Sequence, residues 1–232
     1  MLFRQLFDVH SSTYTYLLAD PATREAVLID PVLGQVERDL QLVRELDLDL
    51  VYVLDTHLHA DHVTGAGAMR ERAGAKTVAG RKGAPCVDVQ VGDGDVIYVG
   101  SIELRALATP GHTDDSVSYL AGDRVFTGDA LLVRGCGRTD FQNGDPSALH
   151  ASITKVLFAL PDSTFVYPAH DYRGLTVTTI GEEKRLNPRV AQRTEAEFVD
   201  IMRGLNLPAP KSLGEAVPAN QACGVVAAVP QG

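Results

Sequence analysis

The chain has 232 residues, of which 45% are hydrophobic, and a formal net charge of -9 at pH 7. This length supports one substantial domain with a buried core, and the excess of acidic residues argues against nucleic acid or an anionic membrane as a partner. The opening residues lack the apolar stretch of a secretory signal, and no run approaches the roughly eighteen apolar residues of a membrane span. We therefore expect a cytoplasmic protein.

The first half of the chain predicts a sheet with a helix packed on it. Three apolar runs rich in β-branched and aromatic residues predict strands, at 13–20, 26–30 and 50–56. Between residues 35 and 48, apolar side chains recur at spacings of three and four, as on one face of an amphipathic helix. These side chains are Val36, Leu40, Val43 and Leu46.

From residue 87 onward the apolar runs are short and are separated by turns that contain glycine. Such spacing is typical of antiparallel strands. The predicted strands are 87–91, 95–99, 102–110, 117–122 and 124–131. We expect these strands to form a second, largely antiparallel sheet.

A helix with clear start and stop signals follows, between Asp145 and Pro161. Asp145 is the expected N-cap, Pro146 occupies the first helical position, and Pro161 ends the helix. The expected buried face carries Leu149, Ile153 and Leu157. The chain then predicts a strand over 163–170 and a helical segment over 182–204 that is interrupted near residue 187.

The order of these elements predicts an α/β (α+β) fold, in which two sheets lie between helices. We expect a single domain over residues 1–232, with a short C-terminal extension from about residue 205. The three cysteines, Cys86, Cys136 and Cys223, are odd in number and far apart in the sequence. This pattern favours reduced thiols in a reducing compartment over a disulfide framework.

Residues 56–62 read THLHADH, which places three of the seven histidines and one aspartate within six positions. Further candidate metal ligands follow other predicted strands, in the manner in which His57 follows the strand 50–56. These are His112, Asp129 and His170. Strand ends that meet at one edge present side chains from a rigid scaffold, and close packing of imidazoles and carboxylates favours a cation between them. The sequence therefore predicts a metal site.

The same residues resemble the signature of the metallo-β-lactamase superfamily, His-x-His-x-Asp-His followed by His, Asp and His. The matching positions are His57, His59, Asp61, His62, His112, Asp129 and His170. The resemblance implies an αββα sandwich with the site at one edge. In a member with two metal ions, Asp129 would bridge an ion on His57, His59 and His112 and an ion on Asp61, His62 and His170.

The stretch ALLVRGCGRTDFQNGD (130–145) resembles the persulfide dioxygenases, or sulfur dioxygenases, more than the glyoxalase II hydrolases of that superfamily. The stretches 176–190 and 206–224 resemble the persulfide dioxygenases as well. A glyoxalase II carries a longer C-terminal region than the one that follows His170 here. The resemblance therefore favours an oxidoreductase with a dioxygenase activity.

This resemblance implies one Fe(II) per chain, held by His57, His112 and Asp129, since two imidazoles and one carboxylate leave open positions on iron for a sulfur substrate and dioxygen. The implied reaction converts glutathione persulfide, O2 and water to glutathione and sulfite. Residues expected around the iron without binding it are His59, Asp61, His62 and His170, and Tyr172 is a predicted hydrogen-bond donor beside it.

Glutathione carries two carboxylates, so its binding site should offer cations. Arg138 is the first candidate for substrate contact and Arg134 the second, because they flank Cys136 in RGCGR, close to Asp129. Asp140 is expected to pair with the substrate ammonium or with Arg138. The resemblance also suggests a homodimer.

Two alternatives remain at the level of sequence. The complete set of seven ligands also fits a dinuclear hydrolase of glutathione thioesters, like glyoxalase II. Cys136 between two arginines would instead suit a non-catalytic sulfur carrier, because nearby cations lower the pKa of a thiol. We prefer a role for Cys136 in a tight turn between its two neighbouring glycines.

Overall fold

The computed structural model describes residues 1–209 and 212–225, and the rest of the predicted C-terminal extension, 210–211 and 226–232, lies outside the described residues. Two six-stranded mixed sheets form the centre of the molecule. The first sheet contains, in spatial order, β1 (Leu2–Asp8), β2 (Thr13–Ala19), β3 (Glu25–Ile29), β4 (Asp49–Leu54), β5 (Lys76–Gly80) and β6 (Val89–Val91). The second contains β7 (Val96–Val99), β8 (Ile102–Ala108), β9 (Val117–Ala121), β10 (Arg124–Gly128), β11 (Phe165–Pro168) and β12 (Thr178–Thr179).

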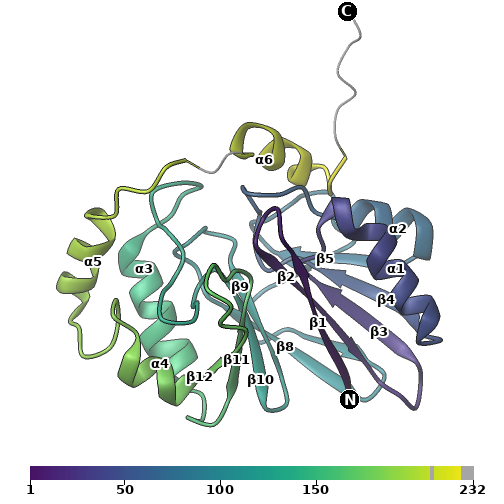
Figure 1. Ribbon diagram of the computed structural model, residues 1–232, viewed down its shortest axis with the longest axis horizontal. Coiled ribbons are helices and arrows are strands. Elements are labelled where there is room, and N and C mark those ends of the chain that lie inside the picture. The colour runs from purple at the N-terminus through teal and green to yellow at the C-terminus, as the bar shows by residue number, and fades with distance from the viewer. Residues whose placement is uncertain (210–211, 226–232) are drawn as a thin grey trace, which may run out of the picture.

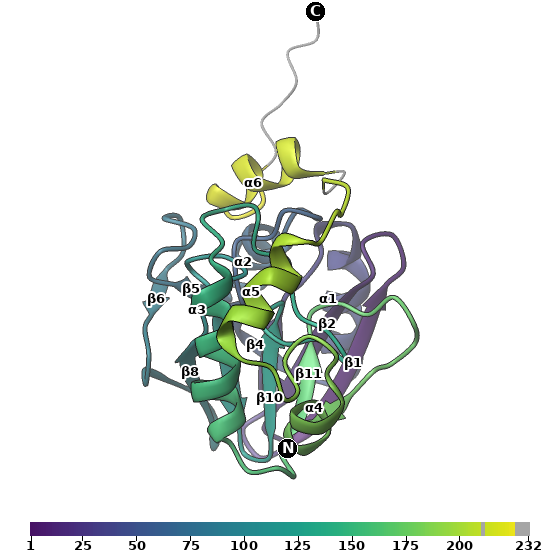
Figure 2. The ribbon, with the colours of Figure 1, turned by 90° about the vertical axis from the view of Figure 1, so that its left-hand side faces the viewer.

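Helices cover the outer face of each sheet, which gives the predicted αββα sandwich (Figure 1). The first sheet is covered by α1 (Val36–Glu45) and α2 (Ala66–Ala73). The second sheet is covered by α3 (Pro146–Ala151), α4 (Ile180–Leu186) and α5 (Glu195–Arg203). The last helix, α6 (Leu213–Gln221), lies apart from both layers, across the end of the sandwich at the top of Figures 1 and 2.

Strand β2 shows how the sequence builds this sandwich, because all seven of its residues are buried. Tyr16 and Leu18 point into the core between the two sheets, whereas Leu17 and Ala19 point outward into the core beneath α1 and α2. A strand covered on both faces reads as a continuous apolar run rather than as an alternating one. The strand predicted over 13–20 is confirmed, and its burial on both faces explains why the run is apolar throughout.

The helices predicted from periodicity and from their start and stop signals are also present. Val36, Leu40 and Val43 are buried on α1. The side chain of Asp145 caps α3 by accepting hydrogen bonds from the backbone N–H groups of Ser147 and Ala148, and the helical path continues as a π-turn and a 3-10 turn to residue 159. The interruption near residue 187 separates α4 from α5.

Residues 87–91 were predicted in the second sheet, and that prediction is wrong. Strand β6 pairs in parallel with β5 and belongs to the first sheet. The side chain of Asp88 accepts hydrogen bonds from the backbone and the hydroxyl of Thr77, which holds β6 beside β5. A short apolar run predicts a strand but carries no information about which edge it joins.

The expectation of three reduced cysteines is also wrong, since Cys86 and Cys223 form a disulfide across 137 residues of sequence. Their Cα atoms lie 5.9 Å apart because the C-terminal segment returns to α2 and β5 after crossing the molecule. Only Cys136 is a free thiol in the described residues. Within the same residues, no helix has the length and apolar character needed to cross a membrane.

Candidate metal centre

The four predicted strand ends meet at the end of the sandwich that α6 crosses. His57 follows β4, His112 follows β8, Asp129 follows β10 and His170 follows β11. The side chain of His170 contacts Asp129, and the rings of His57 and His112 lie 4.8 Å apart between centroids. Residues separated by more than 100 positions are thus brought together by the two sheets, as the sequence predicts.

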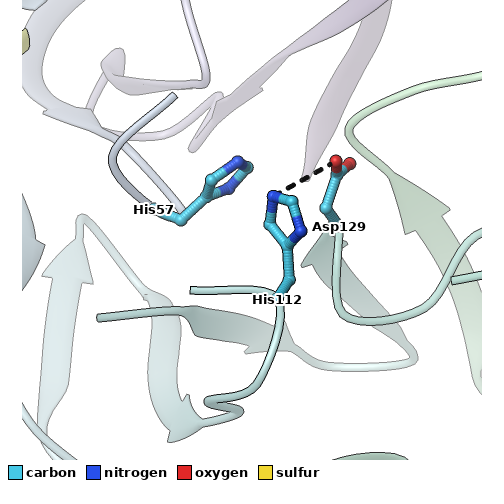
Figure 3. A group of neighbouring side chains, drawn as sticks. All are labelled: His57, His112 and Asp129. Atoms are coloured by element: carbon cyan, nitrogen blue, oxygen red, sulfur yellow. Dashed lines mark ion pairs between the residues drawn. The ribbon is translucent and has the colours of Figure 1, made fainter. Parts of the chain in front are cut away.

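His57, His112 and Asp129 form one group in which the potential ligand atoms all lie within 4.8 Å of one another (Figure 3). Nε2 of His112 is 3.5 Å from Oδ2 of Asp129. The three side chains come from both sheets and point into a common space. Two imidazole nitrogens and a carboxylate oxygen on one side of a cation are the facial ligand set of non-haem Fe(II) oxygenases.

The ring of His57 is oriented by side chains at its other nitrogen. Oγ1 of Thr56 donates a hydrogen bond to Asp30 (2.9 Å) and lies 3.0 Å from Nδ1 of His57. Because the hydroxyl proton is directed to Asp30, the oxygen of Thr56 accepts from Nδ1–H of His57, which leaves Nε2 as the metal ligand. Burial lowers the pKa of His57 well below its usual range, so the imidazole is neutral and able to bind a cation.

A glycine allows the second sheet to approach this pair. Gly128, the last residue of β10, has a φ of +53°, and a Cβ there would lie 2.5 Å from Oγ1 of Thr56. Only glycine provides both the conformation and the space. Gly128 therefore allows Asp129 to lie next to His57, and any other residue type at position 128 would be strained.

The ring of His112 is oriented by the backbone. Its Nδ1–H donates to the carbonyl oxygen of Arg138 (2.7 Å), and a carbonyl can only accept, so Nε2 is again the free ligand atom. Gly137 packs against the same ring, because a Cβ at this position would lie 2.7 Å from Nδ1 of His112. The loop after β10 thus fixes one of the three ligands.

Asp129 is held by a chain of ionisable groups. Its Oδ1 accepts from Nδ1 of His170 (2.7 Å), and Nε2 of His170 donates to Asp61 (2.9 Å). Burial opposes the charge on each group, but the two carboxylates raise the pKa of His170 well above its usual range, and the positive ring holds the pKa of Asp129 well below its usual range. A protonated His170 between two carboxylates follows.

His59 and His62 lie beside this chain and complete a second group with Asp61, within 4.8 Å. Nε2 of His59 is 3.1 Å from Oδ1 of Asp30, and this carboxylate raises the pKa of His59 to about 9 despite the opposing effect of burial. Nδ1 of His62 contacts Asp61 at 2.9 Å. Nδ1 of His59 and Nε2 of His62 are buried and have no hydrogen-bond partner among the described residues, so this group also fits a cation.

Tyr172 lies beside His170 at the surface of the molecule. Its ring lies nearly parallel to that of His170, with centroids 6.1 Å apart, and the residue is 74% exposed. The structure therefore places Tyr172 beside the predicted group, at a position open to an incoming molecule. Its role as a hydrogen-bond donor stays a prediction.

The two arginines of RGCGR have different surroundings. Arg138 forms a bidentate ion pair with Asp140 (2.6 and 2.7 Å) and stacks on Phe141, and it also donates to the carbonyl of Pro208. Arg134 forms an ion pair with Glu183, a side chain with no exposed surface. Arg138 and Asp140 thus lie on the loop that holds His112, whereas the charge of Arg134 is matched inside the protein.

Cys136 lies in the core rather than at the metal centre. It is 3% exposed, packs against Met202 with 3.7 Å between the sulfur atoms, and its pKa is raised by burial. A buried neutral thiol is a poor nucleophile and has no access to a carrier partner. The sulfur-carrier alternative therefore lacks support in the structure.

Two residues of this site, Asp30 and Asn220, were missed in the sequence. Asp30 accepts hydrogen bonds from Thr56 and faces His59. Asn220, on α6, contacts the backbone of residues 55–65, the segment between β4 and α2 that we call the metal-binding loop. Asp30 directly follows the strand β3, so its place after a predicted strand, like that of His57, was a usable signal. The contact of Asn220 spans 161 positions in the sequence and had no such signal.

The model of the Metallo-beta-lactamase superfamily matches this chain over residues 10–85 and 84–170. The chain is 50% identical over 228 residues to a mouse protein named persulfide dioxygenase ETHE1, mitochondrial, a match that covers 97% of this chain and 89% of the mouse protein. The crystal structure of ETHE1 from Myxococcus xanthus is similar with a TM-score of 0.96 and 66% identity, and the match covers 97% of this chain and 100% of that one.

A hydroxyacylglutathione hydrolase from a Polaromonas species is 40% identical over 166 residues. That match covers 68% of this chain and 62% of the hydrolase. The similarity to the hydrolase is therefore partial, whereas the similarity to the dioxygenases runs over nearly the whole chain.

Proposed function

Because this chain belongs to the persulfide dioxygenases of the metallo-beta-lactamase superfamily, we propose that it oxidises glutathione persulfide with O2 and water to glutathione and sulfite at a single Fe(II). The chain is an oxidoreductase. The identity of the metal, its number and the identity of the persulfide are the parts that we propose.

The arrangement of His57, His112 and Asp129 carries the proposal. Both histidines turn Nε2 toward the same space, because Nδ1 of each is directed to a hydrogen-bond acceptor, and Asp129 adds one carboxylate oxygen. This donor set fits Fe(II) with open coordination positions. When bound, the iron would supply the binding and activation of O2 next to the persulfide sulfur.

The surrounding residues position these ligands and limit the access of water. His170, held between Asp129 and Asp61, keeps the carboxylate of Asp129 oriented. Thr56, which donates to Asp30, orients the ring of His57. His57, His59 and His170 are each no more than 3% exposed. We propose that substrate enters from the side of Tyr172, where the site is open.

For the peptide part of the substrate we propose Arg138 and Asp140 as contacts. Their ion pair lies on the loop whose carbonyl orients His112, so a ligand bound to this pair would lie close to the metal. We propose that Arg134, which pairs with buried Glu183, supports this loop instead of meeting the substrate. A homodimer and a cytoplasmic location stay predictions.

A dinuclear thioester hydrolase is the second candidate, and one observation favours it. The unpartnered nitrogens of His59 and His62 would suit a second cation. Against it, both ring nitrogens of His170 are already directed to carboxylates, those of Asp129 and Asp61, so neither points to a second cation.

Two assays on the protein purified and loaded with iron under nitrogen separate the candidates. We expect O2 uptake with glutathione persulfide, with sulfite as the product, and little hydrolysis of S-lactoylglutathione. Asp129→Ala should abolish the uptake, because one of three iron ligands is lost. Hydrolysis of the thioester without O2 uptake would favour the dinuclear candidate, and undiminished uptake by Asp129→Ala would contradict the ligand assignment.

A further inference from the structure

The C-terminal segment reaches the metal-binding loop although it lies outside both sheets and their covering helices. Figures 1 and 2 show α6 crossing the end of the sandwich where the strands carrying the ligands terminate. We call residues 220–224, the last part of α6 and the turn after it, the C-terminal clamp. Its contacts are made to residues 59–67, which follow His57 and include the first turn of α2.

Asn220 is the centre of this contact. Its side-chain amide donates to the carbonyl oxygens of His59 and His62, both at 2.9 Å, and its oxygen accepts from the backbone N–H of Thr64 at 2.8 Å. Asn220 is 2% exposed. One buried side chain thus satisfies three backbone groups of an irregular loop, where an unpaired buried group would cost about 1–3 kcal/mol.

Two glycines, one on each side, allow the clamp to come this close. The N–H of Gly67 donates to the carbonyl of Cys223 (2.8 Å), and a Cβ at Gly67 would lie 2.4 Å from that oxygen. Gly224 has a φ of +84°, and a Cβ there would lie 2.1 Å from the carbonyl oxygen of Thr64. The fit therefore depends on the absence of a side chain at both positions.

A disulfide closes this contact. Cys223 is bonded to Cys86, which follows β5, and the carbonyl of Cys86 accepts a hydrogen bond from Arg70 of α2 (2.9 Å). Cys223 is 1% exposed whereas Cys86 is half-buried. This covalent bond ties the clamp to the segment between β5 and β6, and because it links residues 137 positions apart it also removes conformational freedom from the unfolded chain.

We propose that the C-terminal clamp positions the metal-binding loop through Asn220, and that reduction of the Cys86–Cys223 disulfide releases it and weakens metal binding. The enzyme is then sensitive to the thiol state of its surroundings through a bond distant from the three ligands. The consequence for activity rests on the proposed function, whereas the consequence for metal affinity does not.

The chemical step is an ordinary exchange with a low-molecular-weight thiol. Its thiolate attacks the sulfur of the accessible Cys86, the S–S bond breaks, and the electron pair leaves with the sulfur of Cys223, which takes up a proton. A second thiolate attacks the mixed disulfide and frees Cys86. Two external thiols are oxidised to one disulfide while the two cysteines are reduced.

Binding of Co(II) to the metal-free protein tests the proposal without any turnover. We compare the oxidised protein with protein reduced by a phosphine, which is removed under nitrogen before the titration. The visible bands of Co(II) report the coordination geometry. The variants are Asn220→Ala, Asn220→Asp and Cys86→Ser, with Gln221→Ala as the control, because Gln221 is the exposed neighbour of Asn220 on the same helix.

We expect reduction to weaken Co(II) binding by about tenfold and to alter the visible bands, within the 10–100-fold range typical of residues that orient metal ligands. Cys86→Ser should match the reduced protein and not respond to the phosphine. Asn220→Ala should bind Co(II) about 10–100-fold more weakly. Asn220→Asp keeps only the oxygen that accepts from Thr64, so its affinity should lie between those of Asn220→Ala and of Gln221→Ala, which should bind like the unsubstituted protein.

Equal affinity and identical bands in the oxidised and reduced protein would overturn the proposal and leave the disulfide as a stabilising cross-link only. Absence of the Cys86–Cys223 peptide pair from a non-reducing digest of aerobically purified protein would overturn it as well. If the affinity shifts with reduction but no persulfide-dependent O2 uptake is found, the clamp stands and the proposed function fails.

Discussion

The two candidate histidine ligands, one from each sheet, are held in different ways. At the end of the first sheet, His57 is oriented by the side chains of Thr56 and Asp30, which follow the neighbouring parallel strands β4 and β3 and are almost completely buried. At the end of the second sheet, His112 is oriented by the backbone carbonyl of Arg138, in a loop without regular structure.

His57 is thus positioned by polar and charged side chains, whereas His112 is positioned by a backbone carbonyl and by the space left for its ring. Around His57 the support is ionisable and depends on the exact side chains, so a change of one carboxylate or of pH should alter it. Around His112 the support is a carbonyl that does not titrate, and it depends on the space left by Gly137. Perturbations should therefore affect the two histidines selectively.

Replacement of Asp30 should give the largest effect. Asp30→Ala leaves the backbone N–H of Thr56 and the ring of His59 without their buried acceptor, and breaking such a charged network costs about 3–5 kcal/mol. Urea unfolding of the metal-free protein measures the loss. A matched change at exposed Asp47 (Asp47→Ala), whose ion pair with Arg24 lies on the surface, should cost less than about 1 kcal/mol. Equal losses at both positions would contradict the account of the first sheet.

A methyl group at Gly137 should act on the other histidine. In Gly137→Ala the new Cβ would lie 2.6 Å from the carbonyl of Asp129 and 2.7 Å from His112, so the ring must shift, and metal affinity should fall about 10–100-fold. Gly135→Ala is the control, because its nearest atom would be 3.9 Å away. The measurement is Co(II) titration of both variants. Unchanged affinity in Gly137→Ala would show that the loop yields without moving the ligand.

Alkaline pH should lower the free energy of unfolding of the metal-free protein, because His59 loses its positive charge beside Asp30. The folded pKa of His59, about 9, is above the unfolded value of 6.5, so its contribution is fully present below pH 6.5 and is lost as pH rises through 9. The raised pKa of His170 acts in the same direction. We expect a loss of about 2 kcal/mol from His59 between pH 7 and 10, measured by urea unfolding. His59→Gln should have a flatter profile, and an equally steep one would assign the loss to other groups.

The sandwich and the close approach of the candidate ligands could be predicted because both follow from local sequence patterns, whereas the ligand roles stay a prediction. Strand and helix periodicities identify β2, β3, β4 and α1, and His57, His112 and Asp129 each follow such a strand. The strand β6 was assigned to the wrong sheet because periodicity says nothing about which edge a short strand joins.

What the sequence did not reveal depends on contacts made only after folding. Glu183 looks like one charge of a solvated helix, yet it is buried and paired with Arg134. Cys86 and Cys223 look like unrelated thiols until the return of the C-terminal segment brings them together. Asn220 carries no motif at all, and its three backbone contacts arise from the same return.

The number of metal ions per chain tests the central claim most directly. The protein is loaded with excess iron under nitrogen, freed of unbound metal and analysed for iron and zinc per chain, beside Asp129→Ala. The arrangement of His57, His112 and Asp129, with His170 between the two carboxylates, predicts one iron per chain and almost none in the variant. Two metal ions per chain, or iron retained by Asp129→Ala, would contradict it.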